Sequence, residues 1–99
     1  MVVEQIYEQI ADFITASIQQ EWLTAWIEVE IGEDYASAIG RYYKLGEQNL
    51  YGFRVGQEIV GIFTELRKEI QKPGYALWQK ARFTLQPDGQ FNIEFTYPD

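Results

Sequence analysis

The sequence contains neither cysteine nor histidine among its 99 residues. Without cysteine there are no disulfides, no thiolate nucleophile and no Cys-based zinc or iron–sulfur site. Without histidine the chain lacks the commonest general base and the commonest metal ligand. These absences exclude most familiar catalytic chemistries, and we assign no catalytic, cofactor-binding or metal-ligating residue.

Basic residues are also scarce, with 8 Lys and Arg against 15 Asp and Glu, for a net charge of −7. Nucleic-acid binding draws its affinity from clustered basic side chains, so a nucleic acid is an improbable partner. An acidic protein meets a cationic partner faster through long-range electrostatic steering. The charge therefore favours a basic protein as partner.

Long apolar runs are missing as well. No stretch approaches the ~18 apolar residues of a membrane span, and the first residues lack the basic start of a signal peptide. We therefore expect a cytoplasmic protein without membrane contact. The chain is 46% hydrophobic with only three prolines, which is typical of a globular protein rather than a disordered one. Its length predicts one domain over residues 1–99.

Two segments carry apolar side chains at helical spacing. The first repeats Ile, Phe and Val along one side from about residue 3 to residue 20. The second covers about residues 56–72 and is followed by Pro73-Gly74, a pair that ends helices. Each is predicted to be an amphipathic helix.

Alternating side chains predict strands. Residues 24–31 alternate in this way, residues 36–45 form the returning strand, and residues 49–53 form a short third strand. Near the C-terminus, Pro87-Asp88-Gly89 fits the loop of a hairpin. This loop aligns Leu85 with Phe91, Phe83 with Ile93 and Arg82 with Glu94. The residues expected to be buried there are Phe83, Leu85, Phe91, Ile93 and Phe95.

The order of these elements is helix, two or three strands, helix, two strands. Strand pairs separated by helices are typical of an α+β domain. We therefore predict a single domain with an antiparallel sheet of four to five strands and both helices on one face.

Phosphate-binding loops and dinucleotide fingerprints do not occur. The carboxylates of Glu28, Glu30, Glu33 and Asp34 lie close together in the sequence. They fit a hard-cation site or a glycosidase-like carboxylate pair, but a solvated strand face with an acidic turn is the commoner arrangement and the interpretation we prefer. The 16 aromatic residues are interpreted mostly as core.

Acidic residues are concentrated at the start of the chain. The first forty residues contain no Lys or Arg and eight acids, namely Glu4, Glu8, Asp12, Glu21, Glu28, Glu30, Glu33 and Asp34. Like charges four residues apart on a helix repel one another, as Glu4, Glu8 and Asp12 do. The pattern indicates either a solubilising surface or a docking surface for a cationic protein.

Several segments together resemble the YezG-like immunity proteins. The C-terminal part has a Trp, an alternating strand, a Gly-containing turn and an aromatic-rich strand. The segments that carry the resemblance are Glu21-Trp22, Tyr42-Tyr43, Glu65-Leu66-Arg67 and residues 78–97. The chain departs from the family pattern at Gln90, where Lys is common. The likeness extends over nearly the whole chain in the same element order.

The resemblance implies an immunity protein, or antitoxin, of the cytoplasm. Such a protein binds the toxic domain of a polymorphic secreted or contact-delivered toxin, often a nuclease, and blocks it. No catalytic role is transferred by the resemblance. The alternatives are a small acidic ligand-binding or self-associating module and, less well supported, an enzyme that uses a carboxylate pair.

The partner-binding surface is expected where the charge is most uneven. Trp26 lies beside the carboxylates of Glu28 and Glu30 on the first strand, and Trp is enriched among interface hot spots. An alternative is that a helix covers Trp26 as part of the core. The residues predicted to bind the partner are Trp26, Glu28, Glu30, Glu33 and Asp34, with Glu4, Glu8 and Asp12 as a separate acidic face.

Overall fold

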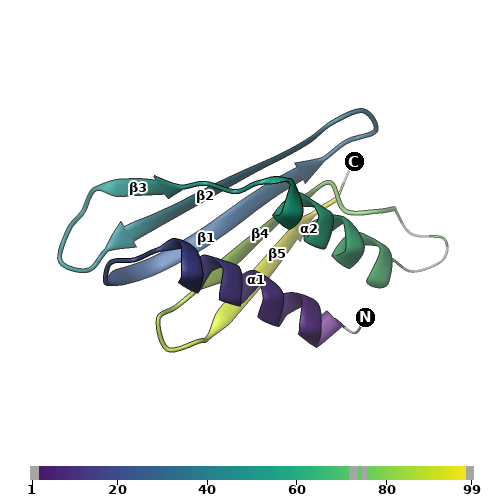
Figure 1. Ribbon diagram of the computed structural model, residues 1–99. Helices are drawn as coiled ribbons and strands as arrows, with labels where there is room; N and C mark the ends of the chain where they lie inside the picture. Colours follow the sequence, from purple (N-terminus) through teal and green to yellow (C-terminus); the bar gives the residue numbers. More distant parts are fainter. Residues whose placement is uncertain (1–2, 72–73, 75, 98–99) are drawn as a thin grey trace.

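A computed structural model describes residues 3–71, 74 and 76–97, which form two helices and five strands. The order confirms the α+β domain predicted from the sequence, including its short third strand (Figure 1). The elements are α1 (Val3–Ser17), β1 (Trp22–Ile31), β2 (Ala36–Lys44), β3 (Leu50–Phe53), α2 (Gln57–Glu69), β4 (Lys80–Leu85) and β5 (Phe91–Thr96).

The five strands form one antiparallel sheet in the order β3-β2-β1-β4-β5. The longest strand, β1, is central and joins the two hairpins. In the C-terminal hairpin Leu85 lies opposite Phe91, and Arg82 lies opposite Glu94, as predicted. Gly89 has a φ of 95°, the left-handed conformation that the hairpin loop requires of this residue.

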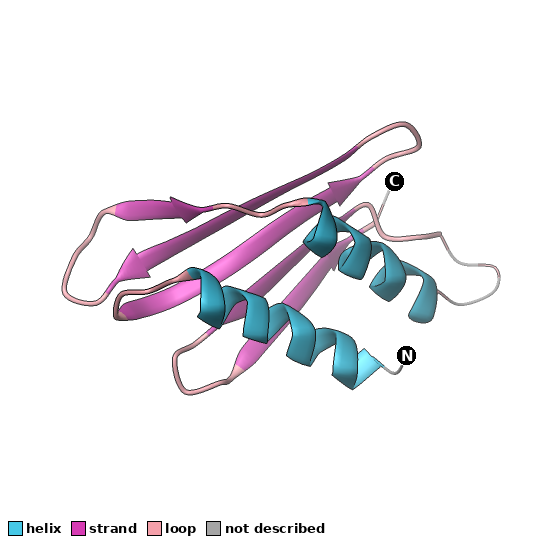
Figure 2. Cartoon of the chain, in the orientation of Figure 1, coloured by secondary structure: helices cyan, strands magenta, loops and turns pink. Residues whose placement is uncertain are grey.

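Both helices pack against the same face of the sheet, and the opposite face has no helix of the described chain over it (Figure 2). The core lies between these two layers. Its fully buried members include Ile6, Ile10 and Ile14 of α1, Ile59, Phe63 and Leu66 of α2, and Ala25, Ile27, Phe83 and Trp78. None of the described helices is long and apolar enough to cross a membrane.

The helices are shorter than their apolar patterns predict. The first ends at Ser17 rather than at residue 20, and the hydroxyl of Ser17 donates to the carbonyl oxygen of Phe13 at 2.8 Å. Such back-bonding by serine competes with regular helix geometry. The second runs over Gln57–Glu69, and the predicted end at Lys72 and Pro73 lies outside the described residues.

Phe91 was predicted to be buried, and this prediction is wrong, because its side chain is 46% exposed. The residue begins an edge strand, so it has a neighbouring strand on one side only. Above it lies Tyr7 of α1, with the ring centroids 5.2 Å apart, and its own ring stacks on Phe83. Ile93 and Phe95 of the same strand are partly buried, whereas Phe83 and Leu85 are buried as predicted.

Candidate partner-binding surface

We call the helix-free side of the sheet the open face. Side chains alternate between the two faces of a strand, so the register assigns each residue to one side. On this basis the open face consists of Thr24, Trp26, Glu28, Glu30, Ser37, Ile39, Arg41, Tyr43, Leu50, Lys80, Arg82, Thr84, Asn92, Glu94 and Thr96. It brings together three residues of the predicted binding surface, Trp26, Glu28 and Glu30.

Trp26 is 8% exposed although no described helix covers it. Arg82 lies over the indole, with Cζ 4.7 Å from the ring centroid, and the Tyr43 ring packs against it at 5.7 Å. The sequence suggested either an accessible anchor beside carboxylates or a core residue beneath a helix. The structure gives a third arrangement, in which side chains of β2 and β4 cover Trp26.

The two carboxylates beside Trp26 have partners. Glu28 Oε1 lies 3.5 Å from Arg82 Nε, and both side chains are about half exposed. Glu30 accepts a hydrogen bond of 3.0 Å from the Tyr35 hydroxyl. That hydrogen bond raises the pKa of Tyr35, because the bonded hydroxyl must keep its proton.

The open face carries as many basic as acidic side chains among the described residues. Its acids are Glu28, Glu30 and Glu94, and its bases are Arg41, Lys80 and Arg82. Lys80 lies opposite Glu30 in the register, just as Arg82 lies opposite Glu28. The acid excess of the first forty residues therefore does not accumulate on this face.

A shallow groove of about 320 Å³ runs along the open face over β2, β1, β4 and β5. Charged side chains of both signs line it, and Ile39 of β2 contributes an apolar side chain that is 45% exposed. Among the described residues no three carboxylates are grouped as a metal ion would require. Within the groove, Glu28 pairs with Arg82.

The other predicted residues lie elsewhere. Glu4, Glu8 and Asp12 are exposed on α1, in the helix layer on the opposite side of the sheet from the open face. Glu33 and Asp34 are exposed in the turn between β1 and β2. The predicted set is therefore divided into a strand group, a turn at one end of the sheet and a helix stripe on the other layer.

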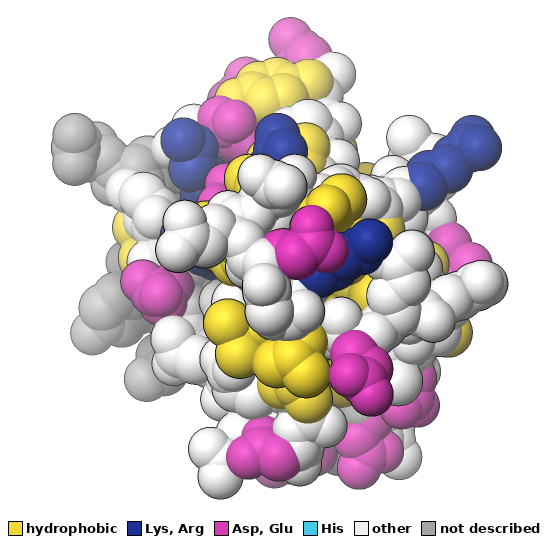
Figure 3. Space-filling view, turned by 90° about the vertical axis from the view of Figure 1, so that its left-hand side faces the viewer, with side chains coloured by type: hydrophobic (Ala, Val, Ile, Leu, Met, Phe, Trp, Pro, Cys, Tyr) yellow, Lys and Arg dark blue, Asp and Glu magenta, His cyan; other side chains and the backbone are white. Residues whose placement is uncertain are grey.

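The sequence did not reveal a second surface, at the end of the molecule where β1 begins and β2 ends. Leu23 and Leu45 are each more than half exposed there, beside a broad hollow of about 860 Å³ that also reaches Trp22 and Pro87. Figure 3 looks onto this end and shows hydrophobic side chains gathered between acidic ones. The exposure of Leu23 follows from a bulge in β1 between Trp22 and Thr24, which the alternation does not predict.

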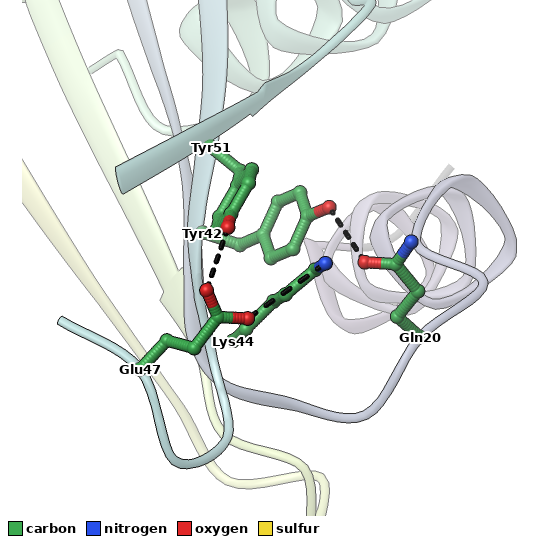
Figure 4. A network of polar contacts seen from close by, with 5 residues as sticks. All are labelled: Gln20, Tyr42, Lys44, Glu47 and Tyr51. Atoms are coloured by element: carbon green, nitrogen blue, oxygen red, sulfur yellow. Dashed lines mark hydrogen bonds and ion pairs between the residues drawn. The ribbon is translucent and has the colours of Figure 1, made fainter. Parts of the chain in front are cut away.

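A network of tyrosines lies at the same end (Figure 4). Tyr42 and Tyr51 stack with centroids 5.6 Å apart, and Lys44 lies over the Tyr51 ring at 4.7 Å. The Tyr51 hydroxyl donates to Glu47 at 2.7 Å, while that of Tyr42 donates to Gln20 at 3.5 Å. The network fixes the loop between β2 and β3 against the segment that follows α1.

Comparison with known proteins finds two similarities. The model of the family described as "Immunity protein YezG-like" matches residues 53–99, from the end of β3 onward. Immunity protein YezG of Bacillus spizizenii is 29% identical over 110 aligned residues, covering 95% of this chain and 68% of that protein. The chain is therefore similar to the YezG-like immunity proteins, over its C-terminal part to the family model and along nearly its whole length to one relative.

The similarity to immunity proteins directs attention to surfaces for contact with a protein partner. The features that matter are therefore accessible surfaces and their charge, as described above for the open face, the acidic turn and the helix stripe.

Proposed function

We propose that this protein neutralises a cognate toxin domain by binding it and covering a surface that the toxin needs. The observation that carries the proposal is the family match together with the similarity to a YezG protein along 95% of the chain. The partner proposed is a basic domain, such as the nuclease domain of a polymorphic secreted or contact-delivered toxin. A net charge of −7 supports this choice, because nuclease active sites are basic. The protein acts in the cytoplasm, where such a toxin meets its nucleic-acid substrate.

The proposed docking surface is the open face together with Glu33 and Asp34 of the adjoining turn. An interface needs an apolar centre and a polar rim, and Ile39 and Leu50 provide exposed apolar side chains among charged ones. Trp26 forms a rigid floor beneath Arg82. The central position of β1 in the sheet also holds these side chains on a stiff support.

The partnered carboxylates suit this role. Glu28 is held by Arg82 and Glu30 by Tyr35, so both are oriented before a partner arrives. Ordering a side chain on binding costs about 0.5–1.5 kcal/mol, and orientation in the free protein lowers that cost. Basic groups of the toxin then replace Arg82 and Tyr35 as partners of these two carboxylates, or bind the carboxylates in addition to them.

The acidic stripe of α1 has a different role in this proposal. Glu4, Glu8 and Asp12 are exposed, and the side of the helix that carries them is polar. Charged residues are depleted from the buried centre of interfaces. The stripe therefore contributes long-range attraction to a basic partner without lying in the contact itself.

Co-expression with candidate toxin domains from the same genome tests the proposal. We expect growth to be restored when the cognate domain and this protein are both produced, and the two proteins to purify as a complex. The matched control is a toxin with its catalytic residues replaced, which permits growth with or without the immunity protein. Growth arrest by every candidate domain in the presence of folded, abundant immunity protein contradicts the proposal, as does rescue without any complex.

A further inference from the structure

The outer edge of β5 pairs with no other strand in the part of the chain that the structure describes. It is one of the two outermost strands of the sheet and runs for six residues without an irregularity in its pairing to β4. Proteins usually protect such edges with Pro, Lys, bulges or very short strands. The other edge strand, β3, has only four residues, whereas β5 has neither Pro nor Lys.

The hairpin fixes which backbone groups of β5 are free. The backbone N–H of Gln86 donates to the carbonyl oxygen of Gln90 at 2.8 Å. The backbone N–H of Gln79 donates to the carbonyl oxygen of Thr96 at 2.7 Å. Hydrogen-bonded and non-hydrogen-bonded pairs alternate along an antiparallel ladder. Asn92, Glu94 and Thr96 therefore direct their backbone groups toward β4. The N–H and C=O groups of the apolar residues point away from the sheet, and these residues are Phe91, Ile93 and Phe95.

The side chains on this edge are also incompletely covered. Phe91 is 46% exposed, and Ile93 and Phe95 are only partly buried on the helix side. On the open face the edge carries Asn92, Glu94 and Thr96. A strand added here would cover an apolar row on one side of the sheet and extend a polar row on the other.

We propose that this edge pairs antiparallel with β5 of a second copy of the chain, about a two-fold axis at Ile93. The two-fold axis can lie at Ile93 or at Glu94, and in either position five residues of each β5 strand are paired. A centre at Glu94 places two carboxylates directly opposite each other, which is destabilising. A centre at Ile93 instead places Asn92 opposite Glu94 of the second copy, so that an amide meets a carboxylate twice. Phe91 then lies opposite Phe95 of the second copy, and the two sheets join into one.

Sedimentation measurements test this assembly over protein concentrations from about 5 µM to about 1 mM, the range of weak dimers. The mass is expected to rise from 11.6 kDa toward twice that value. Asn92→Glu places like charges opposite each other at two positions and is expected to weaken the dimer about tenfold. Adding Glu94→Lys to that variant is expected to restore the dimer. Asn92→Gln is the matched neutral control, since residue 92 is exposed and faces Thr84 within the chain.

Amide hydrogen exchange gives an independent readout on the same samples. The amides of Ile93 and Phe95 are expected to exchange quickly in dilute protein and to slow as the concentration rises, while those of Asn92 and Glu94 stay protected throughout. A chain that is monomeric at every concentration overturns the proposal, and so does a dimer that Asn92→Glu leaves unchanged. If these amides became protected only after toxin is added, the toxin rather than a second copy would pair with β5, and the proposal would also be overturned.

Discussion

Arg82 joins two features of the open face in one side chain. Its guanidinium covers the indole of Trp26 and lies 3.5 Å from the carboxylate of Glu28. An exposed ion pair contributes little on its own, whereas a cation over an indole ring adds about 0.5–1 kcal/mol. Arg82 therefore shields Trp26 and orients Glu28 at the same time.

We expect Arg82→Met to lower the free energy of unfolding by about 1 kcal/mol, because the ring contact and the ion pair are both lost. Urea unfolding measures this change. Arg82→Lys is the matched control, since it keeps the charge but not the planar guanidinium that stacks on a ring. A lysine variant as destabilised as the methionine variant would show that the stacked geometry, not the charge, carries the effect. No loss in either variant would contradict the assigned role.

Tyr7 gives a prediction about pH. Burial, and then the charge of Glu4, raise the pKa of Tyr7 above its ordinary value of 10.0. The unfolded chain therefore loses this proton at lower pH than the folded chain does. The stabilisation is present below pH 10 and decreases as the pH rises through the pKa of the folded protein.

Urea unfolding between about pH 8 and pH 11 tests this, because an ordinary tyrosine, as in the unfolded chain, titrates near pH 10. Tyr7→Phe keeps the packing on Phe83 and Phe91 but has no proton to lose. We expect the variant to lose less stability than the wild type over this range. Parallel pH curves for the two proteins would contradict the assignment.

Single residues also show what could be predicted from the sequence and what could not. The alternation of β1 placed Trp26, Glu28 and Glu30 on one face, and the structure agrees. The partners of these residues come from β2 and β4, and Arg82 is more than fifty residues away from Glu28 in the chain. A local pattern gives the face of a residue but not the strand that lies beside it, so the cover over Trp26 was not predictable.

At the scale of elements, the C-terminal hairpin was predicted residue by residue because its loop fixes its register. The burial of the hairpin's side chains was not predicted in the same detail, because it depends on how far the helices extend over the edge strand. Phe83 and Phe91 stack on each other with centroids 5.1 Å apart, yet the first is fully buried and the second is half exposed.

We therefore expect Phe83→Ala to cost about 3–5 kcal/mol and Phe91→Ala roughly 1 kcal/mol. Both changes remove the same side chain from the same face of one hairpin, so each serves as the control for the other. Chemical denaturation measures both values. Equal losses would mean that α1 covers the edge strand as completely as it covers β4.

Gly40 couples β2 to β3. A methyl group at this position would lie 2.5 Å from the Phe53 ring, which fills the space above the glycine. Overpacking of this kind typically costs about 1–3 kcal/mol, so Gly40→Ala is expected to destabilise the protein by that amount. Thermal unfolding measures the loss, and the double variant with Phe53→Leu should recover part of it. A neutral Gly40→Ala variant would contradict close packing at this point.

At the scale of the whole molecule, the sequence revealed the acid excess but not its distribution. The first forty residues have no basic residue, yet Lys80 and Arg82 lie beside Glu30 and Glu28 in the folded sheet. The other acids of this segment are exposed on α1, at Glu21 and on the turn at Glu33 and Asp34. Charge counted along the chain therefore predicts attraction over long distances, but it does not locate a contact.

Two triple variants follow from this distribution, and each removes three negative charges. The first neutralises Glu28, Glu30 and Asp34 and the second neutralises Glu4, Glu8 and Asp12, using Gln for Glu and Asn for Asp. Because steering depends on the overall field, both should slow association with a basic toxin at low salt by similar factors. Stopped-flow experiments at low and high salt measure the association rates. The difference between each variant and the wild type should disappear at high salt. Rates that remain at the wild-type value in both variants would exclude steering.

The dissociation constants of these two variants for the cognate toxin domain, measured at high salt, test the central claim most directly. Steering is screened there, so only contacts within the interface distinguish the variants. Docking on the open face predicts that loss of Glu28, Glu30 and Asp34 weakens binding at least about tenfold, which corresponds to about 1.4 kcal/mol. Loss of Glu4, Glu8 and Asp12 should leave the constant within a factor of about two of the wild type. The opposite ranking, or equal constants in both variants, would contradict docking on the open face.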